Sequence, residues 1–540
     1  MQRPRVAIAL VALCALATAL AAQTAQARRA WTRPGELRYA LAGLDPRSLN
    51  PLFSTSVQED QLFALFSDLL VTVDERGRAV PELAARVPTS ANGDISRDGR
   101  SITYHLRRGV KWHDGVTFTS RDVRFSWQAV MNPRNNVASR EAYDVVERVD
   151  TPDDYTAILR LKRPFAPAVL TIFGGGQTLR LVPEHVLAKY ADVNAVEFDQ
   201  HPIGTGPFKV VAWKRGQSVE LEANDAYFLG KPKLRRLTVQ LVPVTTTAGV
   251  MLETHETDFA QLDSSTYQRV RDNPNLRVVL ADQYAFIGCP MNVTRPALRD
   301  VRVRRAIVYA LDRRSINDKN TFGTSGLADS DLNPISWAHT TDVVHYPHDP
   351  ARASALLEAA GWRVGSDGVR QKNGVRLVLE LAEPSGGTTA RNEDVQVQEM
   401  LRRVGIEVTI KGYAPSLLYA PAAAGGILES GKFDLTISGW VSSADPDNST
   451  LYMCRYAGPA GQNYSRYCST SMDALQEQAL TTYDVPRRKR AYAEIERLAS
   501  EDLPFVYLYW PKARFAMNPD LRGFAPNGVT PTWNAYSWSI

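Results

Sequence analysis

The chain of 540 residues is too long for one ordinary hydrophobic core, which predicts two or three domains. Its 44% hydrophobic and 22% charged content is typical of a globular protein and argues against a disordered or fibrous one. The formal net charge of +5 is small and spread along the sequence without a dense basic tract, which argues against nucleic-acid binding.

The N-terminus has the pattern of a removable export signal. Arg3 and Arg5 form a basic start, residues 6–22 form an apolar run, and "AQA" at 25–27 fits a small-residue cleavage site. No second long apolar run follows in the sequence. We therefore expect residues 1–27 to be a signal peptide, and the mature protein to be soluble and periplasmic.

The first half of the mature chain predicts a mixture of strands and helices. A strand is expected over 36–43, and apolar residues at helical spacing predict a helix over 58–70. Short strands and helices alternate over about 72–200 and predict an extra α+β subdomain. A Gly/Pro loop followed by a hairpin is expected over 202–225.

A second region begins near residue 283. An amphipathic helix is expected over 299–313 and another over 348–362. Asp349 is placed to cap the start of this second helix, and Gly361 is placed to end it.

The pattern then becomes regular. Strands are expected over 375–382, 406–413 and 433–440, with helices over 389–403 and 415–429 between them. This alternation is typical of a mainly parallel, doubly wound sheet. Ligands bind such sheets at the carboxyl ends of the strands. We therefore expect binding residues in the loops that follow.

Two loops occupy those strand ends. Residues 383–387 read "EPSGG", and residues 441–448 read "VSSADPDN" directly after Trp440. Trp440 is expected to form a wall of the ligand cleft, with a core indole as the alternative.

The end of the chain reads as a strand that returns to the first region near residue 508. The resulting prediction is an α/β fold with two lobes joined by a two-stranded hinge. Its parts are lobe I at 28–282, lobe II at 283–507 and a return to lobe I at 508–540.

The cysteine positions agree with export. Cys454 and Cys468 flank a loop rich in Gly, Asn and Ser, which favours a disulfide in an oxidising compartment, with two free thiols as the alternative. Cys289 lies in an apolar stretch and is expected to be buried and unpaired.

The motifs of common enzyme classes are incomplete. "HETDF" at 255–259 lacks the second His of a zinc helix, and "GTSGL" at 323–327 is not a nucleophile elbow. "GTGPFK" at 204–209 lacks the Lys-Ser/Thr of a phosphate loop. No metal or cofactor is predicted, although three loop histidines could hold a metal: His339, His345 and His348.

Four blocks together resemble one known family. They are "ISRDGRSITYHLRRGVKWHDGVTFTSRDVRFSW", "PIGTGPFKVVAWKRG", "MNVTRPALRDVRVRRAIVYALDRRSI" and "DPARASALLEAAGW". Their order along nearly the whole mature chain is similar to the family 5 solute-binding proteins of ABC importers, the dipeptide, oligopeptide and nickel group. The segment from Trp440 to Cys468 most resembles periplasmic dipeptide-binding members. The resemblance implies a three-part periplasmic receptor, a monomer, that closes on its ligand and delivers it to a membrane permease.

Two departures from the family pattern bear on the ligand. The Asp that pairs with a peptide ammonium, three residues after the Trp, is replaced by Ser443. The Arg for a peptide carboxylate is missing from the loop that begins with Glu383. A buried ligand charge without a partner costs several kcal/mol. Either Asp445 replaces Ser443, or the ligand is not an ordinary short peptide.

The acid that meets a ligand ammonium is expected to be Asp445, with Asp447 and Glu383 as alternatives; Asp447 could instead cap the next helix. The leading ligand class is a peptide or peptide-like solute, and the alternatives are a sugar, an opine or a metal chelate. A secreted hydrolase is the rival from another class. The predicted ligand-binding residues are Trp440, Ser442, Ser443, Asp445, Glu383, Ser385, Ser54 and Tyr413.

Overall fold

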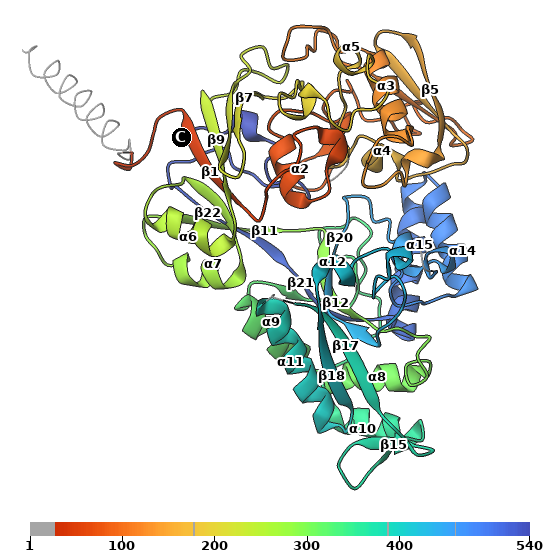
Figure 1. Ribbon diagram of the computed structural model, residues 1–540. Coiled ribbons are helices and arrows are strands. Elements are labelled where there is room, and N and C mark those ends of the chain that lie inside the picture. The colour runs from red at the N-terminus through yellow and green to blue at the C-terminus, as the bar shows by residue number, and fades with distance from the viewer. Residues whose placement is uncertain (1–27, 177–178, 386–387, 459–460) are drawn as a thin grey trace, which may run out of the picture.

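Figure 1 shows a computed structural model of the chain, which describes residues 28–176, 179–385, 388–458 and 461–540. The predicted signal peptide, residues 1–27, lies outside the described residues. Within the described ranges no helix combines the length and the apolar character that crossing a membrane requires.

Lobe I is the part built around a seven-stranded mixed sheet in the order β11-β22-β10-β1-β9-β8-β7. The central strand β1 pairs in parallel with both β9 and β10. Its alternating residues face opposite sides, so Leu37, Tyr39 and Leu41 join one apolar cluster while Ala40 packs with helix α6 on the other face. The elements are β1 (Glu36–Ala42), α2 (Val57–Phe63), β7 (Phe208–Lys214), β8 (Ser218–Ala223), β9 (Arg236–Val242), α6 (Thr245–Glu253), β10 (Phe259–Leu262), α7 (Ser264–Val270), β11 (Arg277–Asp282) and β22 (Lys512–Met517).

A subdomain of lobe I is built around a three-stranded antiparallel sheet, β4-β6-β5, covered by helix α3. The helix begins after Thr119, whose backbone N–H donates to the Asp122 carboxylate over 2.8 Å and so satisfies one of the donors that a helix start leaves free. The elements are β2 (Val71–Val73), β3 (Ala79–Pro81), β4 (Ser101–His105), α3 (Ser120–Met131), β5 (Val146–Asp153), β6 (Thr156–Leu161), α4 (Ala168–Thr171) and α5 (Glu184–Leu187).

Lobe II combines an antiparallel sheet, β13-β21-β12-β20, with a parallel sheet, β18-β17-β19. Parallel pairing, as expected, is found in the sheet β18-β17-β19 and between β1 and its neighbours β9 and β10. The other strand pairs that the structure describes in these two lobes are antiparallel. The elements are β12 (Ala285–Pro290), α8 (Val301–Ala310), α9 (Arg313–Thr321), β13 (Gly326–Leu327), α10 (Pro350–Ala359), β14 (Arg363–Val364), β15 (Arg370–Lys372), β16 (Val375–Arg376), β17 (Val378–Pro384), α11 (Thr388–Arg403), β18 (Glu407–Tyr413), α14 (Thr470–Thr481), α15 (Val485–Asp502) and β21 (Phe505–Trp510).

The structure corrects two predicted elements between 415 and 440. The helix expected over 415–429 is reduced to the single turn α12 (Pro415–Leu418) and a 3₁₀ turn, because Pro421 interrupts it and Gly425 has a φ of 83°. The single strand expected over 433–440 is divided between the sheets of lobe II. Its first part, β19 (Leu435–Thr436), runs parallel to β17, and its second part, β20 (Ser438–Val441), pairs antiparallel with β12.

The chain passes between the lobes through two neighbouring connections. β11 continues into β12 through Gln283 and Tyr284, and β21 continues into β22 through Pro511. The connections are linked where Lys512 Nζ lies 3.2 Å from an Asp282 carboxylate oxygen. Two short connections of this kind can act as a hinge between the lobes.

A second interlobe contact lies where the subdomain, in orange, meets α14 and α15, in blue (Figure 1). The backbone N–H of Ala166 donates to the Leu480 carbonyl over 2.7 Å. The Tyr483 hydroxyl lies 3.0 Å from the Phe165 carbonyl oxygen and 3.2 Å from that of Gly99. Leu480 is buried in the apolar cluster of the subdomain. We call these contacts the seam; they hold the lobes together at a place other than the hinge.

Candidate functional site

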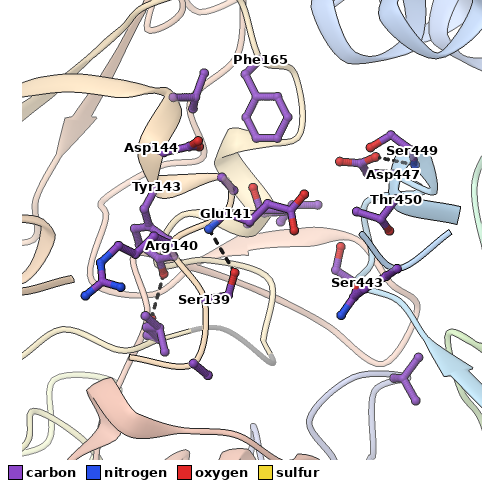
Figure 2. A pocket seen from close by; sticks show the side chains of 18 of the residues that line it. Ser139, Arg140, Glu141, Tyr143, Asp144, Phe165, Ser443, Asp447, Ser449 and Thr450 are labelled. Atoms are coloured by element: carbon purple, nitrogen blue, oxygen red, sulfur yellow. Dashed lines mark hydrogen bonds between the residues drawn. The ribbon is translucent and has the colours of Figure 1, made fainter. Parts of the chain in front are cut away.

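A cavity of about 1010 Å³ lies between the two lobes. In Figure 2, lobe I side chains of the segment before β5 and Phe165 line one wall, and the residues after Trp440 line the facing wall. The lobe I wall consists of 54–57, 138–145, Arg163, Phe165, Leu170, Thr171, Gly176 and Leu179, and the lobe II wall of Trp440, Val441, Ser443, Asp447, Ser449, Thr450, Arg455, Tyr456, Gln462 and Leu480.

The lobe I wall is held by local hydrogen bonds and by a turn of backbone. Ala142 has a φ of 66°, which is uncommon for a residue with a side chain. This turn separates Glu141, which is exposed, from Tyr143, which is buried with its hydroxyl donating to the Leu179 carbonyl over 3.4 Å. The Glu141 carboxylate therefore reaches the cavity while the next aromatic side chain anchors the segment (Figure 2).

The lobe II wall begins with Trp440 at the end of β20. This indole is half-buried, packs at the edge of an apolar cluster and lines the cavity. Ser443 also lines the cavity, but its hydroxyl donates to the Asp445 carbonyl over 3.0 Å. Ser442 is directed to the hinge instead, because its backbone N–H and its hydroxyl both bond the Tyr284 carbonyl, at 2.7 and 3.2 Å.

The structure corrects the prediction for Asp445. Both of its carboxylate oxygens accept hydrogen bonds from the Arg488 guanidinium, each over 2.8 Å. The two side chains are 5% and 7% exposed, and the guanidinium also lies over the Trp337 ring at 5.4 Å. Asp445 is therefore engaged inside lobe II and does not line the cavity.

Asp447, two residues further on, does line the cavity. One of its oxygens accepts a hydrogen bond from the Ser449 backbone N–H over 3.0 Å, at the start of α13 (Ser449–Tyr452). Burial raises the pKa of Asp447, and the charge of nearby Asp445 adds to this effect. Asp447 thus both accepts a hydrogen bond at the start of the next helix and lines the cavity, although the sequence presented these as alternatives.

The described residues of the other predicted loop, and Tyr413 at the end of β18, lie outside the cavity lining. Glu383 is buried, Ser385 is exposed, and the Tyr413 hydroxyl donates to Glu380 over 2.8 Å. None of these three predicted residues lines the cavity between the lobes. Residues 386–387 of the same loop lie outside the described residues. Of the predicted ligand-binding residues, the structure brings together Ser54, Trp440 and Ser443.

Charged residues that the sequence did not single out complete the walls. Arg140 donates to the carbonyl oxygens of Asn132 and Asn135 over 2.8 and 2.6 Å. Arg163 and Arg455 both lie near the carboxylate of Glu477. No local motif marks these positions, since Arg140 lies in the loop before β5, Arg163 lies two residues after β6, and Arg455 lies in a short helical turn. Only their long-range assembly in the fold reveals them.

A disulfide joins Cys454 to Cys468. It closes a loop whose members Arg455, Tyr456 and Gln462 line the cavity. Cys289 is free and buried, and burial together with Asp394 raises the pKa of its thiol to about 12.

The ligand types that metals require are not gathered anywhere in the part of the chain that the structure describes. No group of three or more His, Cys, Asp or Glu side chains is arranged there to hold an ion.

Residues 78–462, more than half of the chain, match the bacterial extracellular solute-binding proteins, family 5 (middle region). The chain belongs to this family. It is thus a binding protein of an extracellular solute-binding family and not an enzyme, as predicted.

Among curated relatives of this family 5 protein, the oligopeptide-binding protein AppA of Bacillus subtilis is 28% identical over 502 residues, 92% of this chain and 90% of the relative. The dipeptide-binding protein of Escherichia coli is 25% identical over 510 residues, 89% of this chain and 90% of the relative.

Solved structures agree with the predicted fold class. NikZ of Campylobacter jejuni, in complex with Ni(L-His), has a TM-score of 0.80 at 27% identity, with 94% of this chain and 100% of that chain covered. AppA of Bacillus subtilis, in complex with a nonapeptide, has a TM-score of 0.77 at 27% identity, with 94% and 99% covered. The α/β periplasmic-binding-protein-like fold is therefore confirmed for this family 5 protein.

Proposed function

We propose that this family 5 protein is the periplasmic receptor of an ABC importer, which captures a peptide or peptide-like solute and delivers it to the membrane permease. The observation that carries this proposal is the cavity of about 1010 Å³ with walls from both lobes. A ligand held by both walls binds the closed form better than the open form and so favours closure. The oligopeptide and dipeptide names of the relatives support the same solute class.

The amino group of the solute is received by Asp447 and Glu141. Asp445 is already paired and Ser443 has no charge, so neither can compensate an ammonium. Asp447 lines the cavity with a raised pKa, which a ligand cation would bring down by compensating its charge. Glu141 makes no ion pair within the described residues and faces the cavity from the other lobe. Burial and this carboxylate together raise the pKa of Tyr456, on the lobe II wall, to about 12.

The solute class is tested first by native mass spectrometry of protein purified without denaturation, followed by calorimetry with the solute that is found or with a pool of short peptides. Saturable binding without turnover is expected. Asp447→Asn should weaken binding of an ammonium-bearing solute by roughly 30-fold or more, since losing a buried acid paired with a ligand cation costs about 2–5 kcal/mol.

The matched control is Asp520→Asn, because Asp520 binds the N-terminal segment through Thr32 and lies outside the cavity lining. Its affinity should equal that of the unmodified protein. Unchanged affinity in Asp447→Asn would exclude a cation at this position and favour a neutral solute such as a sugar.

A metal chelate is a second candidate, because NikZ, which was solved with Ni(L-His), has nearly the same fold over the same length. No His or Cys is among the residues that line the cavity, so a chelate must carry its own nitrogen ligands. Calorimetry with Ni(L-His) set against free histidine and free Ni²⁺ tests this candidate. Binding of the complex alone would favour a chelate over a peptide.

A further inference from the structure

Two arginines from opposite lobes face the cavity near the seam. Arg163 belongs to lobe I and lies two residues before Phe165, which takes part in the seam. Arg455 belongs to lobe II and follows the first cysteine of the disulfide. Both line the cavity.

The carboxylate of Glu477 lies near both guanidinium groups. Nη1 of Arg455 lies 3.0 Å from one oxygen of Glu477, and Nη1 of Arg163 lies 3.8 Å from the other. The second distance is too long for a hydrogen bond. Nη1 of Arg163 is shielded from water and has no hydrogen-bond acceptor among the described residues. Two positive charges therefore share one negative charge, and one shielded N–H group lacks an acceptor.

Aromatic rings orient both guanidinium groups. Arg455 lies over the Tyr456 ring at 4.9 Å, and Arg163 lies over the Phe165 ring at 5.8 Å. Both rings also line the cavity. Stacking of this kind restricts the rotation of the planar guanidinium group and so fixes the directions of its N–H groups. The pair is thus arranged before any ligand arrives.

We propose that Arg163 and Arg455 form a subsite for a carboxylate group of the solute. The inference rests on the proposed function, because the solute supplies the carboxylate. The described residues of the loop that begins at Glu383 include no arginine, and none of them lines the cavity, so the carboxylate is received at the seam instead. Guanidinium groups bind carboxylates through paired, charge-assisted hydrogen bonds.

The location of the subsite couples carboxylate recognition to closure. Since the two arginines belong to different lobes, a carboxylate that meets both can do so only when the seam is formed. Such a group binds the closed form preferentially and shifts the population toward it. A solute that lacks the carboxylate loses both the contact and this contribution to closure.

The test uses two pools of alanine peptides, two to five residues long, one as free acids and one as C-terminal amides. Calorimetry and thermal shift compare the unmodified mature protein with Arg163→Gln, Arg455→Gln and the double variant. Arg497→Gln is the matched control, because Arg497 is 42% exposed, close to the 40% of each subsite arginine, pairs with acids on its own helix and lies outside the cavity lining. Arg455→Lys keeps the charge without the planar fork, and each variant is checked for its circular dichroism spectrum and its melting temperature without ligand.

The unmodified protein is expected to prefer free acids over amides. Each single Gln variant should bind the acids about tenfold more weakly or worse, because a charge-assisted hydrogen bond is lost. The amides should bind all variants alike, and Arg455→Lys should recover part of the preference. Equal binding of acids and amides by the unmodified protein, or a preserved preference in the double variant, overturns the subsite while peptide binding stands.

Failure of both pools to bind refutes the peptide proposal instead. In that case the subsite is judged with succinate titrated at constant ionic strength. A rise in melting temperature that the double variant loses supports the subsite, and an equal response in both proteins, or none, overturns it.

Discussion

The buried pair of Asp445 and Arg488 gives a stability prediction opposite to the one that the sequence suggests. From the sequence, Asp445→Asn should weaken ligand binding and leave the ligand-free protein nearly as stable as before. In the structure, Asn at this position would leave the Arg488 guanidinium without its two 2.8 Å acceptors. Removing one partner of a buried ion pair costs about 3–5 kcal/mol, because the remaining charge stays out of water.

Urea unfolding of the ligand-free mature protein, followed by far-ultraviolet circular dichroism, measures this loss. The matched control is Glu399→Gln, because Glu399 pairs with Arg402 over 3.0 Å while their side chains are 44% and 70% exposed. An exposed pair of this kind contributes less than about 1 kcal/mol. Asp445→Asn should therefore unfold at a clearly lower urea concentration than Glu399→Gln.

A companion variant separates the ion pair from the position itself. Replacing both partners, with Asp445→Leu and Arg488→Met together, should recover most of the stability, because apolar side chains of similar volume avoid the desolvation penalty. The reasoning is refuted if Asp445→Asn loses no more than the exposed control does. It is also refuted if the double replacement is as unstable as the single one.

The remaining predictions concern the cavity wall, the disulfide, the seam and one buried acid. Trp440→Phe should remove much of the change in intrinsic fluorescence on ligand titration, and a full change in the variant would exclude this indole from the wall. Replacing Cys454 and Cys468 by Ser should lower the free energy of unfolding by ~3 kcal/mol through the released loop, measured by urea unfolding, and non-reducing peptide mapping should recover their cross-link; a cross-link to another cysteine would contradict the pairing. Tyr483 lies outside the cavity lining, and Tyr483→Phe should still weaken affinity about fivefold because the closed form loses a hydrogen bond of about 1 kcal/mol. Calorimetry measures this change, and unchanged affinity would exclude a role of the hydroxyl in closure. Burial raises the pKa of Glu393 to about 7, so the folded protein keeps a proton that the unfolded chain loses, and stability falls as the pH rises from about 4 to 7. Urea unfolding at pH 4 and pH 8 compares Glu393→Gln with the unmodified protein. Between these pH values the free energy of unfolding of the variant should rise relative to that of the unmodified protein by up to about 3 kcal/mol, and a constant difference would contradict the shift.

Local sequence patterns predicted the elements that carry their own signals. Helix α10 (Pro350–Ala359) begins where its capping Asp349 lies, because that side chain accepts a hydrogen bond from the backbone within the first turn. The helix expected over 415–429 is wrong beyond its first turn, because Pro421 and Gly425 interrupt it. The division of the strand near 437 could not be predicted, since it depends on two different partner strands, and pairing partners are not encoded locally.

Apart from Ser54, the predicted residues that line the cavity lie at or just after the end of a strand. Trp440 and Ser443 follow directly from that rule. The pairing of Asp445 with Arg488 spans 43 positions of sequence. Arg488 is one of four consecutive basic residues, 487–490, near the start of α15, and the sequence does not mark it apart from the other three. Glu141 and Arg163 come from the subdomain, which reaches the cavity only after both lobes are assembled. Their charge alone gave no reason to prefer them over many other charged residues.

The bond between the Ala166 N–H and the Leu480 carbonyl uses main-chain atoms on both sides of the seam. A main-chain bond persists whichever side chains occupy the two positions, provided that the donor position does not become proline. Substitutions in the cavity walls can therefore alter which solute is preferred while this docking contact is retained. In evolution, point substitutions in the cavity walls can therefore change the preferred solute while the main-chain contact between the lobes is inherited unaltered.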